Sequence, residues 1–397
     1  MIPGPELIFR ESPGPGGERR AAWWSEGVPA PARAVLVDDR VTADAALRRA
    51  RSGEGLVWAG DWHNARQLLA AMGRRLGAPR PHARPVSARP IGARPRVPRL
   101  AGLFHAERER KRIEHEVLSR LVVPIGPGWT TPLRRAPSLE LPLGEAFGPG
   151  PDGPALMPLR EILGAIGAYE WLRRGVPVPA LGGNVHPRYG VFAPVRGEYV
   201  DLVARALATR AAGWKEGWLA FDVGTGTGVL AILLAKAGAR VIATDLDPRA
   251  VACARENAGR FGVAGRVQAV EADLFPPGRA RLVVANPPWV PAVPHGPLDR
   301  AVYDPGGAVL ERFVGALADH LAEGAEAWLV LSDLAERLGL RPPGALEAMF
   351  EKAGLRVAFT LEAQPSHPRA RDAGDPLADA RRAERTRLHG LAVAPRG

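Results

Sequence analysis

Cysteine is almost absent from this chain, because Cys253 is the only one among its 397 residues. A single cysteine excludes an internal disulfide and any cysteine-based metal cluster within one chain. Histidines with the spacing of metal ligands are lacking as well. His105 and His115 lie ten positions apart, which places them on different faces of the helix expected there. We therefore expect no metal site.

Long apolar runs and a charged leader followed by an apolar stretch are also missing. Residues 1–20 are rich in proline and glycine, and no stretch is apolar over the length needed to cross a bilayer. Hydrophobic residues still make up 46% of the chain, which is ordinary for a globular protein. The sequence therefore predicts a cytoplasmic protein with a sizeable core and no membrane partner.

Lysine is scarce, with four among the 53 basic residues, and the net charge of +11 is unevenly spread. Residues 1–135 hold 24 Lys and Arg against 13 Asp and Glu, whereas residues 136–397 hold 29 of each kind. The whole excess lies in the N-terminal region, which favours an acidic partner such as nucleic acid or a ribosomal surface. An arginine-rich coding bias is the alternative explanation of the same excess.

Composition and periodicity divide the chain into four regions. Residues 79–99 repeat proline and arginine with almost no large apolar residue, so we expect an extended linker there. Residues 1–78 form a basic accessory region of short strands and a helix, and residues 100–180 a mainly helical accessory region. Residues 181–397 form a domain in which strands alternate with helices.

Seven apolar segments of this last domain have the length and composition of strands. They are Trp218–Val223, Arg240–Thr244, Arg266–Glu271, Arg281–Ala285, Ala327–Leu331, Arg356–Leu361 and Leu388–Ala394. Helical periodicity fills most of the gaps, which predicts an α/β fold with a doubly wound, seven-stranded, mostly parallel sheet. The last two strands have no helical pattern between them, so we expect them to pair as an antiparallel edge.

A glycine-rich turn follows the first of these strands. The segment reads Asp222, Val223, Gly224, Thr225, Gly226, Thr227, Gly228 and then an apolar helix. Glycine is needed where a Cβ would keep a ligand away from the backbone, so this turn is typical of a nucleotide cradle. Asp245 ends the next strand, where its carboxylate can accept hydrogen bonds from two ribose hydroxyls. These features alone do not separate a nicotinamide site from a site for S-adenosylmethionine.

Two further segments end the third and fourth strands. The first, Asp273-Leu274, places an acceptor where an adenine amino group can donate. The second reads Asn286, Pro287, Pro288 and Trp289. The side-chain carbonyl of Asn286 and the backbone carbonyl of Pro287 can hold the two N–H groups of a planar amine, and Trp289 can stack on its plane.

These positions all lie at the carboxyl ends of parallel strands, where open α/β sheets bind ligands. Together they predict a site that methylates a planar nitrogen. Each also has a plain structural explanation: Asp245 and Asp273 can cap a helix or a turn, and the two prolines can end a strand.

With these motifs the chain resembles the class I S-adenosylmethionine-dependent methyltransferases. Within that group it is similar to the release-factor glutamine methyltransferases and the related small-domain RNA and DNA amino-methylases. The resemblance covers about residues 189–394, and its strongest parts are the turns at 224–228 and 286–289. It implies a set of cofactor-binding residues: Asp222, Gly224, Thr225, Gly226, Thr227, Gly228, Asp245, Asp273, Leu274 and Asn286. It also implies a catalytic turn of Asn286, Pro287, Pro288 and Trp289.

The chain departs from that family at three places. Residues Tyr189–Tyr199 occupy the position of its motif before the sheet but lack the form Pro-Arg-x-x-Thr-Glu, and Trp289 stands where tyrosine is usual. The N-terminal region is also longer than the family's substrate domain. From the motifs and the resemblance we expect an N-methyltransferase acting on a planar amide or exocyclic amine nitrogen, most like the protein glutamine N5-methyltransferases. An RNA or DNA adenine or guanine amino-methyltransferase is the alternative. A non-catalytic module that binds S-adenosylmethionine is the third possibility.

Overall fold

The structure is a computed structural model that describes residues 5–10, 18–77, 100–294, 298–364 and 375–395. The chain divides into two compact units. The first consists of Met1–Pro98 and His105–Glu170, and the second of Arg99–Phe104 and Trp171–Gly397. Within the described ranges, no helix is long and apolar enough to cross a membrane.

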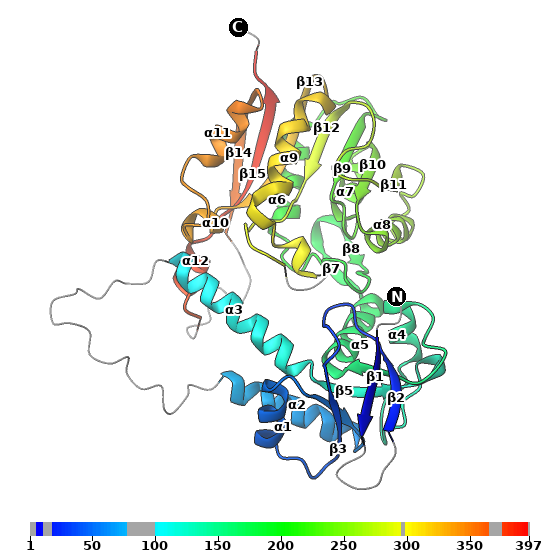
Figure 1. The fold of residues 1–397 in the computed structure, drawn as a ribbon. Coiled ribbons are helices and arrows are strands. Elements are labelled where there is room, and N and C mark those ends of the chain that lie inside the picture. The colour runs from blue at the N-terminus through cyan, green and yellow to red at the C-terminus, as the bar shows by residue number, and fades with distance from the viewer. Residues whose placement is uncertain (1–4, 11–17, 78–99, 295–297, 365–374, 396–397) are drawn as a thin grey trace, which may run out of the picture. The chain divides into compact units, whose positions relative to one another are not determined.

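The first unit contains a closed β-barrel with helices outside it (Figure 1). Its strands follow the order β1-β2-β6-β5-β4-β3 around the barrel. They are β1 (Glu6–Arg10), β2 (Glu18–Trp23), β3 (Ala34–Val37), β4 (Gly55–Trp58), β5 (Leu121–Ile125) and β6 (Ala155–Pro158). The helices are α1 (Ala43–Arg51), α2 (Trp62–Gly77), α3 (Leu100–Leu118), α4 (Glu140–Phe147), α5 (Leu159–Arg174) and the 3₁₀ turn η1 (Pro127–Trp129).

The barrel joins two regions that the sequence analysis treated separately. Strand β4, before the expected linker, pairs in parallel with β5, after it, through Leu56 opposite Leu121. Short apolar strands cannot bury both faces alone, and closing the barrel buries Trp23, Val57 and Val122 in one cluster. Residues 1–78 and most of 100–180 therefore share one unit, while the whole of the expected linker lies outside the described residues.

The second unit is a sheet of seven strands in the order β11-β10-β9-β12-β13-β15-β14. The strands are β9 (Leu219–Val223), β10 (Arg240–Asp245), β11 (Val267–Glu271), β12 (Ala280–Ala285), β13 (Leu321–Ser332), β14 (Leu355–Ala363) and β15 (Thr386–Val393). A separate two-stranded sheet is formed by β7 (Val176–Val178) and β8 (Gly183–Val185). The predicted α/β fold with a mostly parallel, seven-stranded sheet is confirmed.

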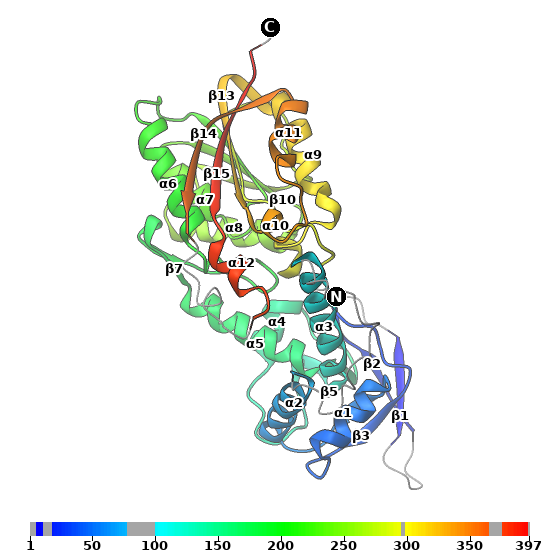
Figure 2. The same cartoon turned by 90° about the vertical axis from the view of Figure 1, so that its left-hand side faces the viewer.

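Helices cover both faces of this sheet (Figure 2). They are α6 (Glu198–Arg210), α7 (Val229–Lys236), α8 (Pro248–Arg260), α9 (Ala308–Leu317), α10 (Leu334–Arg337), α11 (Ala345–Lys352) and α12 (Ala378–Ala383). The 3₁₀ turns are η2 (Pro179–Leu181), η3 (Leu298–Ala301), η4 (Pro305–Gly307) and η5 (Ala318–His320). Alternate residues of each strand face opposite layers. Ala220 packs with the α6, α7 and α8 side, whereas its neighbour Phe221 packs with α9 and α11.

The order of the last strands differs in one respect from the expectation. β14 and β15 pair antiparallel as predicted, but β15 also pairs antiparallel with β13, so it lies between β13 and β14. Helix α11 connects β13 to β14, which runs in the same direction as β13. Between β13 and β14 this connection leaves space for one strand. The chain then returns through α12, a short helix where the sequence analysis expected none, and β15 fills that space, which leaves β14 as the edge.

Candidate active site

The backbone of the glycine-rich turn is open at two of its three glycines. Gly224, Gly226 and Gly228 have φ angles of +73°, +55° and +80°, a region that favours glycine. A Cβ at Gly224 or Gly226 would have no atom within 4 Å, so the chain leaves open space there. A Cβ at Gly228 would lie 3.0 Å from Ala254 Cα. The first two glycines thus form a cradle, and the third lets α7 and α8 approach closely.

Asp222 holds this turn from inside the protein. Its carboxylate is 1% exposed and accepts hydrogen bonds from Thr225 Oγ1 at 2.6 Å and from the Ala231 backbone N–H at 3.0 Å. Burial raises the pKa of Asp222 to about 6, although both hydrogen bonds oppose that change. Thr227 is buried too, and its carbonyl accepts from Asn257 Nδ2 at 3.0 Å. Cofactor contact by Asp222 and Thr227 stays a prediction, because their described contacts shape the turn.

Asp245, at the end of β10, lies directly beside the glycine-rich turn. Its Oδ2 accepts the Gly226 N–H at 2.9 Å, and its Oδ1 accepts the Asp247 N–H at 3.0 Å. Burial raises the pKa of this carboxyl above its ordinary value. The helix cap that the sequence offered as a plain explanation belongs to Asp247, which accepts from Arg249 N at 2.9 Å. Backbone N–H groups thus engage the Asp245 carboxylate, and its contact with a ribose stays a prediction.

Leu274 and Asp273 follow β11 and differ in what holds them. Leu274 has a φ of +68°, one of three non-glycine residues in the left-handed region among those described. Its carbonyl accepts the Thr244 hydroxyl, which ties this strained residue to the end of β10. The Asp273 carboxylate forms an ion pair with Arg312 of α9, and its side chain is 49% exposed. The expected role of Asp273 toward adenine stays a prediction, with Arg312 as its partner here.

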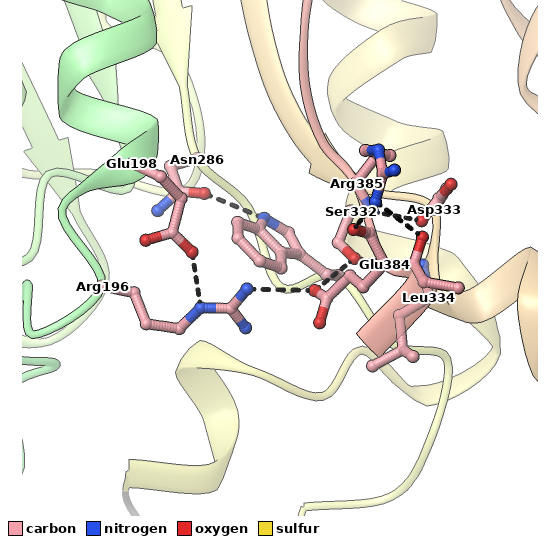
Figure 3. Close-up of polar contacts among 10 residues, drawn as sticks. Arg196, Glu198, Asn286, Ser332, Asp333, Leu334, Glu384 and Arg385 are labelled. Atoms are coloured by element: carbon pink, nitrogen blue, oxygen red, sulfur yellow. Dashed lines mark hydrogen bonds and ion pairs between the residues drawn. The ribbon is translucent and has the colours of Figure 1, made fainter. Parts of the chain in front are cut away.

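The Asn286 turn follows β12, the strand next to β9. The indole Nε1–H of Trp289 donates a hydrogen bond to Asn286 Oδ1 at 2.9 Å (Figure 3). Pro287 is buried, and Asn286, Pro288 and Trp289 are half-buried. The sequence analysis identified these four residues but missed the bond between the first and the last. A tyrosine ring carries no such N–H, so the tryptophan itself was the available signal.

Arg196, which sequence reasoning did not single out, lies over the Trp289 ring with its guanidinium carbon 5.4 Å from the ring centroid. Its Nε donates to Glu198 Oε1 at 2.8 Å and its Nη2 to Glu384 Oε1 at 3.2 Å (Figure 3). Ser332 Oγ also donates to Glu384, at 2.6 Å. The two carboxylate side chains are only 6% and 4% exposed. Two nearly buried carboxylates thus fix one arginine against the tryptophan.

Glu198 also carries an unused acceptor. Its Oε2 is buried and has no hydrogen-bond partner among the described residues. Burial, together with the charges of Asp222 and Glu198, raises the pKa of Tyr199 above its ordinary value. Tyr199 is therefore within electrostatic reach of both carboxylates, which places the segment before the sheet close to the glycine-rich turn. Among the residues that the structure describes, no group of three or more His, Cys, Asp and Glu is arranged to hold a metal.

A family model described as ribosomal protein L11 methyltransferase (PrmA) matches residues 205–287, from α6 to the Asn286 turn. A ribosomal protein L11 methyltransferase from Pelotomaculum thermopropionicum is 53% identical over 75 residues, covering 18% of this chain and 24% of that protein. A release factor glutamine methyltransferase from Moorella thermoacetica is 36% identical over 149 residues, covering 31% of this chain and 52% of that protein.

Among solved structures, a ribosomal protein L11 methylase from Lactobacillus delbrueckii subsp. bulgaricus is similar with 19% identity and a TM-score of 0.34. That match covers 49% of this chain and 79% of the other. The chain thus spans between about a quarter and about a half of the length of the two relatives described above. The matched segment contains the glycine-rich turn, Asp245 and the start of the Asn286 turn.

Proposed function

Because the second unit is a class I S-adenosylmethionine-dependent methyltransferase domain, we propose that the chain methylates a side-chain amide nitrogen of a protein. The acceptor would be a protein of the translation machinery, since the relatives are named for ribosomal protein L11 and release factors. We place the reaction in the cytoplasm, on or near the ribosome. The observation that carries the proposal is the bond that fixes Asn286 beside the cofactor cradle.

The residues of the cradle fit S-adenosylmethionine. The open backbone at Gly224 and Gly226 accommodates the methionine part, and the Asp245 carboxylate accepts from ribose hydroxyls. The unpartnered Oε2 of Glu198 fits a cationic ligand, because a buried carboxylate oxygen without a partner is costly. When bound, the cofactor supplies an electrophilic methyl group on a positively charged sulfur.

Asn286 and Pro287 would hold and orient the amide that is methylated. An amide oxygen has two lone pairs, and the Trp289 N–H uses one of those on Asn286. The other lone pair and the Pro287 carbonyl can accept the two N–H groups of a primary amide. This grip directs the nitrogen lone pair away from both acceptors and stabilises positive charge as it develops on nitrogen. The Trp289 bond keeps the Asn286 amide from rotating and presenting its NH₂ instead.

The surroundings of Trp289 favour an amide over a nucleobase. Stacking a base requires an accessible aromatic face. Here Arg196 lies over the ring, the indole N–H is engaged by Asn286, and the ring packs against three apolar clusters. Trp289 in this position supports Asn286 rather than serving as a stacking platform, which was the role expected from the sequence. A side-chain amide needs no such platform.

A labelling experiment tests the proposal. The purified protein is incubated with S-adenosylmethionine that carries a tritiated methyl group, together with either the protein or the nucleic-acid fraction of a cell extract. We expect label in protein, located by mass spectrometry as one added methyl on glutamine or asparagine. Asn286→Ala should lose the labelling, whereas Asn184→Ala, whose side chain donates to the Arg174 carbonyl, should retain it.

Three outcomes contradict the proposal. Label in RNA or DNA without label in protein would establish the nucleobase alternative. Equal labelling by Asn286→Ala and the wild type would remove the proposed role of that side chain. Binding of S-adenosylmethionine without transfer to either fraction would indicate a non-catalytic module.

A further inference from the structure

A groove in the first unit is lined by residues that are distant in sequence from those of the candidate active site. It has a volume of about 640 Å³ and is bordered by α2, α3 and α5, which can be followed in Figure 2. The α2 side contributes residues at helical spacing, so they form one stripe of that helix. These are His63, Arg66, Gln67, Leu69, Ala70 and Gly73. All of the lining residues belong to the first unit.

Arg160 of α5 lines this groove and has no hydrogen-bond or ion-pair partner within the described part of the chain. Burial lowers the pKa of Arg160. Among the residues that the structure describes, only the charge of Glu114 opposes this effect, and Glu114 forms no hydrogen bond with Arg160. Arg160 also stands in the first turn of α5, where the helix dipole disfavours a positive charge. The burial of Arg160, its position in the first turn of the helix and its lack of a described partner all lower the stability of the fold. A bound anion would offset those costs.

Much of the groove lining is apolar. Leu118 of α3 and Leu163 of α5 line the groove, and Ala70 and Gly73 leave it open on the α2 side. A ligand that fits therefore carries a carboxylate next to apolar side chains. Glu114 at the same groove repels every anion, and it repels a doubly charged phosphate more strongly than a singly charged carboxylate. No Phe, Tyr or Trp lines the groove, so apart from the imidazole of His63 it lacks the stacking surface that single-stranded nucleic acid uses.

The chain's own arginine-rich segment is a poor occupant. Residues 78–99 begin directly after α2, carry six arginines and contain no Asp or Glu. That charge opposes binding beside Arg66 and Arg160. The net charge of +11 over residues 1–135 attracts an acidic partner to the same unit. Charge therefore favours a separate, acidic protein over this segment.

We propose that the groove between α2, α3 and α5 binds an acidic, amphipathic segment of the protein that the chain methylates. A carboxylate of the segment pairs with Arg160 and Arg66, and its apolar side chains cover Leu118 and Leu163. This identification of the partner rests on the proposed function, whereas the groove's preference for such a segment does not. The first unit then selects the acceptor through chemistry separate from that of the methyl-transfer site.

The test measures binding of the full-length protein to a fluorescent 20-residue amphipathic peptide of glutamate and leucine, by anisotropy. Arg160→Glu should weaken binding at least about ten-fold, as for loss of one charge-assisted hydrogen bond. The matched control Arg74→Glu reverses a charge on an exposed α2 residue outside the groove and should change affinity less than about two-fold. Ala70→Phe, which fills the groove from an exposed position, should weaken binding without any change of charge.

Thermal melts show whether each variant is folded, and calorimetry measures its binding of S-adenosylmethionine. Because peptide binding requires neither cofactor nor methyl transfer, the groove proposal can fail while the proposed function stands. Absence of peptide binding by the wild type overturns the proposal, as does equal weakening by Arg160→Glu and Arg74→Glu. Stronger binding of a 20-nucleotide single-stranded RNA, lost in Arg160→Glu, would also overturn it in favour of nucleic acid. Normal S-adenosylmethionine binding in these cases would leave the proposed function standing.

Discussion

Replacing Asp245 by alanine should weaken binding of S-adenosylmethionine by about 1.5–3 kcal/mol, the range for hydrogen bonds to a charged group. The carboxylate has about four acceptor sites, and the N–H groups of Gly226 and Asp247 occupy two of them at 2.9 and 3.0 Å. The remaining sites are those that ribose hydroxyls would use. The expected loss corresponds to a Kd that rises roughly ten- to 150-fold.

Calorimetric titration with S-adenosylmethionine measures this effect without knowledge of the methyl acceptor. The matched control is Asp247→Ala, two residues away, which removes the α8 cap to Arg249 N. That change should lower stability by about 1 kcal/mol and leave cofactor affinity nearly unchanged. Asp245→Asn keeps a neutral acceptor and should give an intermediate affinity.

Two results would refute this reasoning. A Kd for Asp245→Ala within two-fold of the wild type would exclude a direct ribose contact. An equal loss in Asp247→Ala would attribute the effect to the shape of the loop rather than to the carboxylate. Tight binding of a nicotinamide dinucleotide, with no binding of S-adenosylmethionine, would overturn the cofactor assignment itself.

The other predictions concern catalysis and pH. Asn286→Ala should keep cofactor affinity within a few-fold and lower turnover by roughly 10²–10³, measured on the acceptor found by labelling; near-normal turnover would contradict its role. Trp289→Phe should lower turnover about two- to ten-fold, because it removes the hydrogen bond to Asn286. In the Asn286→Ala variant the same substitution should lower turnover little further. Additive effects of the two substitutions would indicate that Trp289 acts on the substrate directly. Burial lowers the pKa of His389 from 6.5 to about 4. Because the unfolded chain then binds the proton more readily than the folded one, the free energy of unfolding should fall by up to about 3 kcal/mol as the pH drops from 6.5 to 4. The raised pKa of Asp222, about 6, increases stability as the pH falls through part of this range, opposite to the effect of His389. The contribution of His389 is therefore measured by comparing the thermal melts of His389→Gln and the wild type across this pH range. Identical pH profiles of the two proteins would disprove that contribution.

Much of the methyltransferase fold was predictable because its signals are local. Strand and helix periodicities lie within short segments, and the carboxyl ends of parallel strands meet at one edge of a sheet. The turn at Gly224–Gly228, Asp245 and Asn286 could therefore be assigned to strand ends before any contact between them was known. The structure brings Asp245 into contact with Gly226, and it confirms a mostly parallel sheet, in which β12 lies beside β9.

What the sequence did not reveal depends on contacts between distant residues. Arg196 and Glu384 are 188 positions apart, and no local pattern marks either as a neighbour of Trp289. The Trp289–Asn286 bond depends on side-chain rotamers, which packing selects. The barrel joins strands on both sides of an arginine-rich segment, and β15 enters the sheet where α11 leaves a gap. Residue types and periodicity thus determined the class of fold and the chemistry of the motifs, whereas long-range packing decided which side chains hold those motifs in place.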